Sequence, residues 1–298
     1  MKKILCIDGG GMRGYLPVAI LVELEARTGR RCSELFDGIW GTSIGGIAAG
    51  LLGSGVPAKD VLKFFTDDGP KIFKKRFGHW IGVFGPRYSA RVIEAVLAKR
   101  FEGCEPRTRL GLTVFDLATQ SPYFFKFGPH LKHLVPLWQA ARATSSAQIY
   151  FPAFHAFLPD GEHVFWDGGN VANNPAVCAL ADAKRHWSHH RIVMLSLGCG
   201  TPRVDDGQTL AAARKLVNTD AFHNGLATMA TLFEADSEEV DYQMRQFLGE
   251  HYVRIQPLLD QMLPMDDATP AGLQNLRDAA VNAVRDSRAA LERFLAKI

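Results

Sequence analysis

Two glycine-rich turns, each between a short apolar run and a helix-forming segment, occupy the first 52 residues of this chain. The first unit runs from KILCI (residues 3–7) through DGGGMRG (residues 8–14) into residues 15–28, whose apolar side chains recur at helical spacing. The second runs from FDGIW (residues 36–40) through GTSIG (residues 41–45) into a stretch rich in alanine and glycine. Repeated strand–turn–helix units are typical of parallel sheets covered by helices. We therefore predict an α/β fold with a mostly parallel central sheet.

The alternation of strands and helices continues as far as residue 202. Further strands are predicted at residues 110–115, 123–127, 163–166 and 192–197, and helices at residues 57–65, 90–101 and 175–186. Beyond residue 202 the pattern is helical, and the last helix is predicted to begin with Thr269 as its cap and Pro270 in its first turn. We expect one domain over residues 1–298, with a motif-bearing core at residues 1–202 and a helical part at residues 203–298.

Composition restricts the class of protein and of partner. The net charge of +3 is too small to indicate a nucleic-acid polymer as partner. The five cysteines are scattered and include no C-x-x-C pair for a metal ion, which suits a reducing compartment. No apolar run approaches the roughly 18 residues of a membrane span, and the run after Lys2 and Lys3 is too short for a secretory signal. We expect a cytoplasmic protein that uses no metal and no cofactor.

The glycine loop allows two interpretations. GGGMRG (residues 9–14) fits the G-x-G-x-x-G pattern of a dinucleotide site, although such a match arises by chance about one time in four in a chain this rich in glycine. A dinucleotide site also needs an acidic residue at the end of the second strand, whereas Asp37 stands before that strand. The alternative is an oxyanion hole, in which backbone N–H groups at a helix start bind a negative oxygen. Glycine would then be required because a Cβ would block the substrate carbonyl and exclude positive φ angles.

Ser43 lies at the centre of the second turn. Gly41 and Gly45 leave room for the tight strand-to-helix turn that exposes a nucleophilic serine, although a glycine-rich helix start capped by serine is the simpler interpretation. A serine hydroxyl needs a base, and none of the ten histidines stands in a position that marks it as one. Asp167 instead ends an apolar run and precedes Gly168 and Gly169. Since α/β sheets bind ligands at the carboxyl ends of their strands, Asp167 is the candidate base; its alternative role is a turn-forming Asp-Gly.

Taken in order, DGGGMRG (residues 8–14), GTSIG (residues 41–45) and DGG (residues 167–169) resemble the three motifs of the patatin-like phospholipases. The resemblance covers roughly residues 1–202 and implies a three-layer α/β/α sandwich with a Ser–Asp dyad that needs no histidine. By position it makes Ser43 the nucleophile, Asp167 the general base, and Gly10 and Gly11 the oxyanion donors. Residues in supporting motif positions are Gly9, Arg13, Gly14, Gly41, Gly45, Gly168 and Gly169.

The activity implied by the resemblance is hydrolysis of acyl esters of membrane phospholipids, with release of free fatty acid. Arg13 would steady the loop or a phosphate. Two other functions remain open: a dinucleotide-binding oxidoreductase, and a non-catalytic binding protein on the same fold. Compact proteins of this kind also resemble bacterial anti-phage effectors that a cyclic nucleotide activates, which makes such a nucleotide a candidate partner.

A mixed basic and aromatic segment suggests how the chain would reach a lipid. Residues 71–84, which begin with Lys71 and end with Phe84, interleave basic side chains with aromatic ones. This composition is typical of segments at a membrane interface. The segment predicts peripheral contact with the inner face of the membrane; the alternative is that its aromatic side chains belong to the core.

Overall fold

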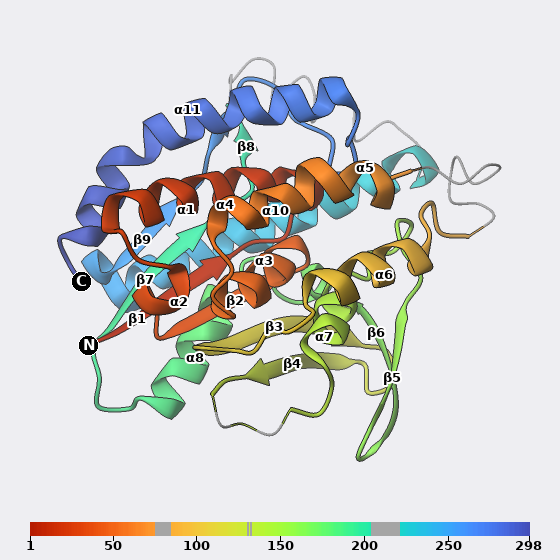
Figure 1. The fold of residues 1–298 in the computed structure, drawn as a ribbon, viewed down its shortest axis with the longest axis horizontal. Coiled ribbons are helices and arrows are strands. Elements are labelled where there is room, and N and C mark those ends of the chain that lie inside the picture. Colours follow the sequence, from red (N-terminus) through yellow and green to blue (C-terminus); the bar gives the residue numbers. More distant parts are fainter. Residues whose placement is uncertain (75–84, 130, 132, 204–220) are drawn as a thin grey trace.

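A computed structural model of the chain describes residues 1–74, 85–129, 131, 133–203 and 221–298 (Figure 1). Its main sheet has the strand order β5-β6-β3-β2-β1-β7-β9, and β4 pairs with β3 off this path. The strands are β1 (Lys2–Ile7), β2 (Gly38–Thr42), β3 (Arg109–Asp116), β4 (Ser121–Phe127), β5 (Phe154–Leu158), β6 (Gly161–Asp167), β7 (Ile192–Leu197) and β9 (Tyr252–Ile255). Strands β3, β2, β1, β7 and β9 run parallel, whereas β4, β5 and β6 pair in antiparallel fashion. The predicted α/β class with a mostly parallel sheet is confirmed.

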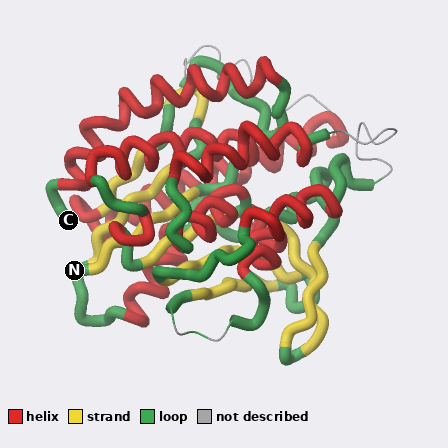
Figure 2. The backbone as a smooth tube through the Cα atoms, in the orientation of Figure 1, coloured by secondary structure: helices red, strands yellow, loops and turns green. Residues whose placement is uncertain are grey.

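Helices cover both faces of the sheet, and Figure 2 shows the strands in the middle of the molecule. The helices with eight or more residues are α1 (Tyr15–Thr28), α3 (Ile44–Gly53), α6 (Ala90–Arg100), α7 (Leu137–Thr144), α8 (Ala176–His186), α10 (Ala221–Leu248) and α11 (Pro270–Leu295). Shorter elements are η1 (Gly11–Gly14), α2 (Cys32–Leu35), α4 (Ala58–Lys63), η2 (Phe64–Asp68), α5 (Gly69–Ile72), η3 (Gly168–Asn170), β8 (Thr201–Pro202), η4 (Gly249–His251) and β10 (Leu258–Leu259).

The alternation of side chains along β1 divides the core into two layers. Leu5 and Ile7 belong to the larger apolar cluster with α1, α3 and α11, whereas Ile4 and Cys6 belong to a smaller cluster with α8 and α10. Successive side chains of a strand point to opposite faces, so one strand supplies both layers. The result is an α/β/α sandwich.

The C-terminal part adds a strand as well as helices. β9 pairs with β7 in parallel, and α11 packs against α1 (Figure 1). The Thr269 side chain accepts a hydrogen bond from the N–H of Gly272 at 3.1 Å, so α11 begins with the predicted cap. The prediction that residues 203–298 are helical was incomplete, because β9 is only four residues long and has no alternating pattern of its own.

Candidate active site

Ser43 occupies a strained turn between β2 and α3. Its φ angle of 55° is positive, which for a residue other than glycine is uncommon and occurs only at two further positions in the described part of the chain. The turn brings α3 against the end of β1, where a Cβ on Gly45 would lie 2.3 Å from the Ile7 carbonyl oxygen. Only glycine fits there. A Cβ on Gly41, near the end of β2, would lie 2.1 Å from the Gly45 carbonyl oxygen, so this position also requires glycine.

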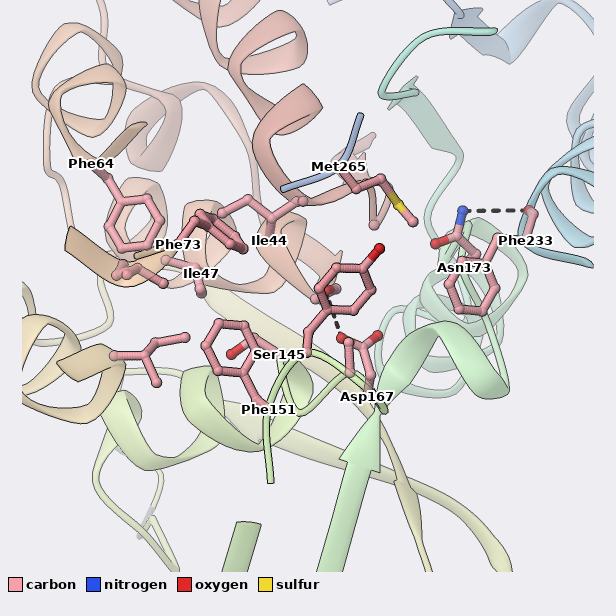
Figure 3. A pocket seen from close by; sticks show the side chains of 18 residues that line it. Ile44, Ile47, Phe64, Phe73, Ser145, Phe151, Asp167, Asn173, Phe233 and Met265 are labelled. Carbon is pink, nitrogen blue, oxygen red and sulfur yellow. Dashed lines mark hydrogen bonds between the residues drawn. The ribbon is translucent and has the colours of Figure 1, made fainter. Parts of the chain in front are cut away.

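The Ser43 hydroxyl donates a hydrogen bond to the Asp167 carboxyl, with 2.7 Å between Oγ and Oδ2. The dashed line at Asp167 in Figure 3 marks this contact. The second carboxyl oxygen, Oδ1, accepts a hydrogen bond from the N–H of Gly169 at 2.7 Å. A carboxylate held by two donors cannot rotate freely, so Oδ2 stays directed at the serine oxygen. The two side chains that the sequence predicts as nucleophile and base are therefore in direct contact.

The strand register explains how Asp167 reaches Ser43. Thr42 pairs with Thr113 across β2 and β3, and Val114 pairs with Asp167 across β3 and β6. Asp167 ends β6, as predicted, but β6 runs antiparallel to β3, so Asp167 does not stand at the carboxyl edge of a parallel pair. Asp167 reaches the site because β6 overlaps only the last three residues of β3.

Burial controls the ionisation of Asp167, which is 2% exposed. Burial raises the pKa of its carboxyl to about 6, against the opposing effects of the hydrogen bonds from Ser43 and Gly169 and of the positive charge of Arg142. A base needs a pKa near the working pH to accept and return a proton efficiently. The environment of Asp167 thus suits general-base catalysis near neutral pH.

A pH profile follows from this value. We expect kcat/KM to be level above about pH 6 and to fall about tenfold per pH unit below it, because the protonated carboxyl cannot accept the serine proton. The check is kcat/KM between pH 4 and pH 8 on a neutral short-chain ester, so that only the enzyme titrates. An acid limb centred near pH 4 would mean that burial does not raise the pKa of the base.

The glycine loop places Gly9, Gly10 and Gly11 around the same pocket as Ser43 and Asp167. The Gly9 N–H donates to the Asn173 carbonyl at 3.2 Å, and the Met12 N–H to the Met265 carbonyl at 2.8 Å. Within the described part of the chain, the intervening N–H groups of Gly10 and Gly11 form no hydrogen bond. The two N–H groups predicted as oxyanion donors are therefore left unpaired by the loop.

The requirement for glycine in this loop has a different cause from the one expected. Gly11 has the predicted positive φ angle of 58°, but a Cβ there would lie 2.2 Å from the Met265 carbonyl oxygen, and a Cβ on Gly10 would lie 2.4 Å from the Cβ of Cys199. The chain's own atoms, rather than the substrate, exclude a side chain. Met265 is far from the loop in sequence, and no local pattern marked it as part of the site.

Arg13 is buried, and it is not among the residues that line the pocket beside Ser43. It donates to the Gly200 carbonyl at 3.2 Å and to the Met262 sulfur at 2.9 Å. These two contacts anchor the glycine loop to the segments around residues 200 and 262. Gly14 ends η1 and directly precedes α1, and Gly168 begins η3 directly after Asp167.

Three threonines without a predicted role complete the turn around Ser43. The Ser43 N–H donates to the Thr144 hydroxyl at 2.9 Å, and that hydroxyl donates to the Thr113 carbonyl at 2.6 Å. Thr42 in turn contacts the Thr113 hydroxyl at 2.8 Å. The sequence shows Thr144 only as one of several small residues in ATSSA (residues 143–147).

The pocket beside Ser43 and Asp167 is almost entirely apolar. Its walls come from α3, η2, α6, the loop after α7, and α10, and they include Ile44, Ile47, Phe64, Ile93, Phe151 and Phe233. Figure 3 shows Phe64, Phe73 and Ile47 gathered to one side of Asp167, with Met265 and Phe233 on the other. An apolar pocket with one polar corner suits a long hydrocarbon chain whose ester lies at the serine.

The histidines and Asp37 lie elsewhere. No histidine lines the pocket in the part of the chain that the structure describes. His163 binds Asp116 at 2.7 Å instead. Asp37 precedes β2, so it lies at the end of the sheet opposite Ser43, where it binds Lys2. The carboxylate that a dinucleotide site requires is therefore not beside the glycine loop.

Comparisons with known proteins show the family to which the chain is similar. A family model described as "Patatin-like phospholipase" matches residues 5–180. The cGAMP-activated phospholipase of Pseudomonas aeruginosa (strain BWHPSA011 / Pa011) is 28% identical over 298 residues, which cover 95% of this chain and 85% of that protein. "Probable inactive patatin-like protein 9" of Arabidopsis thaliana is 30% identical over 304 residues, covering 85% of this chain and 74% of that protein.

Among solved structures, VipD from Legionella pneumophila aligns with a TM-score of 0.51 at 11% identity. The alignment covers 98% of this chain but 66% of that one, and at this identity it shows the fold alone. Separately, no helix in the described ranges is both long and apolar enough to cross a membrane.

Proposed function

This chain belongs to the patatin-like phospholipases, which are lipid acyl hydrolases, and we propose that it cleaves phospholipid esters with Ser43 as nucleophile and Asp167 as general base. The observation that carries the proposal is the 2.7 Å contact between Ser43 Oγ and Asp167 Oδ2 at the polar corner of an apolar pocket. The substrate follows from the pocket: a fatty acyl ester of a membrane phospholipid.

Acylation begins when Asp167 accepts the hydroxyl proton as Ser43 Oγ attacks the ester carbonyl carbon. The carbonyl oxygen becomes negative and accepts hydrogen bonds from the N–H groups of Gly10 and Gly11, each such donor lowering the barrier by about 2.7–4 kcal/mol. The intermediate then collapses, and Asp167 returns the proton to the departing alcohol oxygen. A lyso-lipid leaves, and the fatty acyl group remains on Ser43.

Deacylation repeats the same steps with water. Asp167 accepts a proton as the water oxygen attacks the acyl carbon, the same glycine N–H groups hold the second oxyanion, and the proton returns to Ser43 Oγ as the acyl–oxygen bond breaks. The products are free fatty acid and free enzyme. One carboxyl group thus serves both half-reactions, so no histidine is needed.

A fluorophosphonate probe tests the nucleophile. We expect it to label the wild-type protein at Ser43 and to leave Ser43→Ala unlabelled, and fatty acid release from phosphatidylcholine vesicles should vanish in the same variant. Ser121→Ala, which removes a serine hydroxyl at the start of β4, should label as the wild type does. Because one relative is named as inactive, labelling decides directly between an enzyme and a binding protein on this fold. Labelling of Ser43→Ala would place the nucleophile elsewhere.

We propose in addition that a cyclic dinucleotide raises the hydrolysis rate, as part of a defence against phage. Its support is the relative named as a cGAMP-activated phospholipase, which aligns over 95% of this chain. Adding cGAMP to the purified protein should then increase fatty acid release from vesicles at least several-fold. An equal rate with and without the nucleotide, and with related cyclic dinucleotides, would refute this activation and leave the catalytic proposal intact.

Peripheral contact with the inner face of the membrane also stays a proposal. Of the basic and aromatic segment at residues 71–84, residues 75–84 lie outside the described residues. Lys74 is exposed just before them, and Lys71 binds Asp68 at 2.9 Å. The support for membrane contact is the composition of the segment, together with a substrate class that resides in the bilayer.

A further inference from the structure

A single arginine is completely buried beside the active site. Arg142 lies near the end of α7, two residues before the Thr144 that holds the Ser43 N–H, and its exposed fraction is 0%. Burial of a guanidinium costs several kcal/mol unless other groups compensate for the lost water. A buried arginine therefore indicates that polar or negatively charged groups lie around it.

Each guanidinium nitrogen of Arg142 donates one hydrogen bond, but these contacts only partly balance its charge. Nη1 donates to the Ser146 hydroxyl at 2.6 Å, and Nη2 to the Pro152 carbonyl at 2.9 Å, both of which are neutral. Nε donates to Glu94 on α6 at 3.3 Å, and the Glu94 side chain is 36% exposed. Because water screens Glu94, part of the positive charge of Arg142 remains effective toward the interior.

A single residue, Ser146, connects Arg142 to the candidate base Asp167. Ser146, whose hydroxyl binds Arg142, also accepts a hydrogen bond from the Asp167 N–H through its carbonyl oxygen, at 3.1 Å. One residue therefore joins the buried cation to the backbone of Asp167. Asp167 is almost as deeply buried, so the interaction between the two charges is weakly screened.

The groups that face these two side chains come from several elements. Asp167 is approached by the Ser43 hydroxyl at the start of α3, by the Gly169 N–H of η3, and by the charge of Arg142 from α7. Burial raises the pKa of the nearby Tyr150 phenol to about 12, so this pocket residue is uncharged near neutral pH. Arg142 is faced by Glu94 from α6 and by Asp167.

We infer that Arg142 is a positioning residue that keeps the base ionised: its buried charge stabilises the Asp167 carboxylate, and Glu94 sets how much of that charge Asp167 feels. This inference rests on the proposed role of Asp167 as the base. Burial alone would leave a larger fraction of Asp167 protonated near neutral pH, and the positive charge of Arg142 lowers the pKa of the carboxyl against that effect. Glu94, as a competing anion, weakens this action.

Two substitutions should move the pH profile in opposite directions. Arg142→Gln removes the cation, so the acid limb of kcat/KM moves to higher pH. Glu94→Gln removes the competing anion, so the limb moves to lower pH. At pH 5 we expect kcat/KM, relative to each variant's own plateau, to fall about threefold or more in Arg142→Gln and to rise in Glu94→Gln. Arg142→Lys, which keeps a positive charge, should restore the wild-type limb.

If Arg142 has only a structural role, Arg142→Gln will lower the plateau value of kcat/KM without moving its acid limb. Arg91→Gln, which removes an exposed arginine from the same helix as Glu94, is the control and should leave the limb in place. Glu94 is partly exposed, so Glu94→Gln keeps the test valid even where Arg142→Gln does not fold. Acid limbs that coincide with the wild type in the folded variants overturn the inference.

The failure of this inference can be told apart from the failure of the proposed function. If Asp167→Asn retains hydrolysis, the base itself has been wrongly assigned. If Asp167→Asn is inactive while Glu94→Gln and Arg142→Gln keep the wild-type limb, only the role of Arg142 is wrong.

Discussion

Replacing Asp167 with asparagine is expected to lower kcat by about 10⁴-fold, the upper end of the range for loss of a general base. Both half-reactions need a proton acceptor at the position of Oδ2, so one substitution affects acylation and deacylation together. Asparagine has nearly the same shape, and its carbonyl oxygen can still accept the Gly169 N–H. The fold should therefore persist. The measurement is kcat on a short soluble ester, with circular dichroism and thermal unfolding to verify the fold.

A matched control lies on the same hairpin. Asp160, between β5 and β6, has a side chain that is 74% exposed, and Asp160→Asn should keep wild-type kcat. Asp167→Asn should also react far more slowly with the fluorophosphonate, because Ser43 would lack its base. If Asp167→Asn retains more than about a tenth of the wild-type kcat, another group activates the serine.

Replacing Arg254 with methionine is expected to lower the free energy of unfolding by about 3–5 kcal/mol. Arg254 lies on β9, and its Nη1 donates to Asp8 at 2.9 Å and to the Ser196 hydroxyl at 2.8 Å. Both charged side chains are at least 96% buried. Removing the cation leaves the Asp8 carboxylate buried without its partner, and Asp8 directly precedes the glycine loop. Urea unfolding, followed as a shift of the midpoint at constant slope, measures the loss.

Arg245→Met is the control for this substitution. Arg245 on α10 pairs with Asp241 at 2.9 Å, but its side chain is 57% exposed, so its loss should cost less than about 1 kcal/mol. Adding Asp8→Asn to Arg254→Met should recover part of the lost stability, because no unpaired charge then stays buried. Equal shifts for Arg254→Met and Arg245→Met would contradict the assignment of a buried ion pair.

The fold could be predicted where the pattern is local. Residues 192–197 were predicted as a strand and form β7 within the same bounds, and the cap of α11 was predicted from Thr269 and Pro270. Apolar runs and capping residues act over a few positions, so they remain readable in the sequence. The pairing of β9 with β7 joins segments about 60 residues apart, and nothing local to either strand specifies it.

In the candidate site, too, the local motifs could be predicted from the sequence and the contacts between strands could not. Three motifs contain Ser43, Asp167 and the glycine loop, and the structure brings all three together around one pocket. Asp167 was predicted from its glycine neighbours and from the family resemblance. In the structure it lies beside Ser43 because β6 pairs in antiparallel fashion with the end of β3. That overlap depends on pairing between strands, which the sequence around Asp167 does not record.

The sequence by itself determined the two turns and the residue types of the candidate site, because strand–turn–helix patterns and a positive φ angle such as that of Gly11 are local properties of the chain. Tertiary structure alone decided the environment of Asp167. Arg142, Thr144 and Met265 act through burial and contact, which depend on what the fold places beside them. Charge, screening and the shape of the oxyanion site are properties of that packing, and so they become visible only in the folded chain.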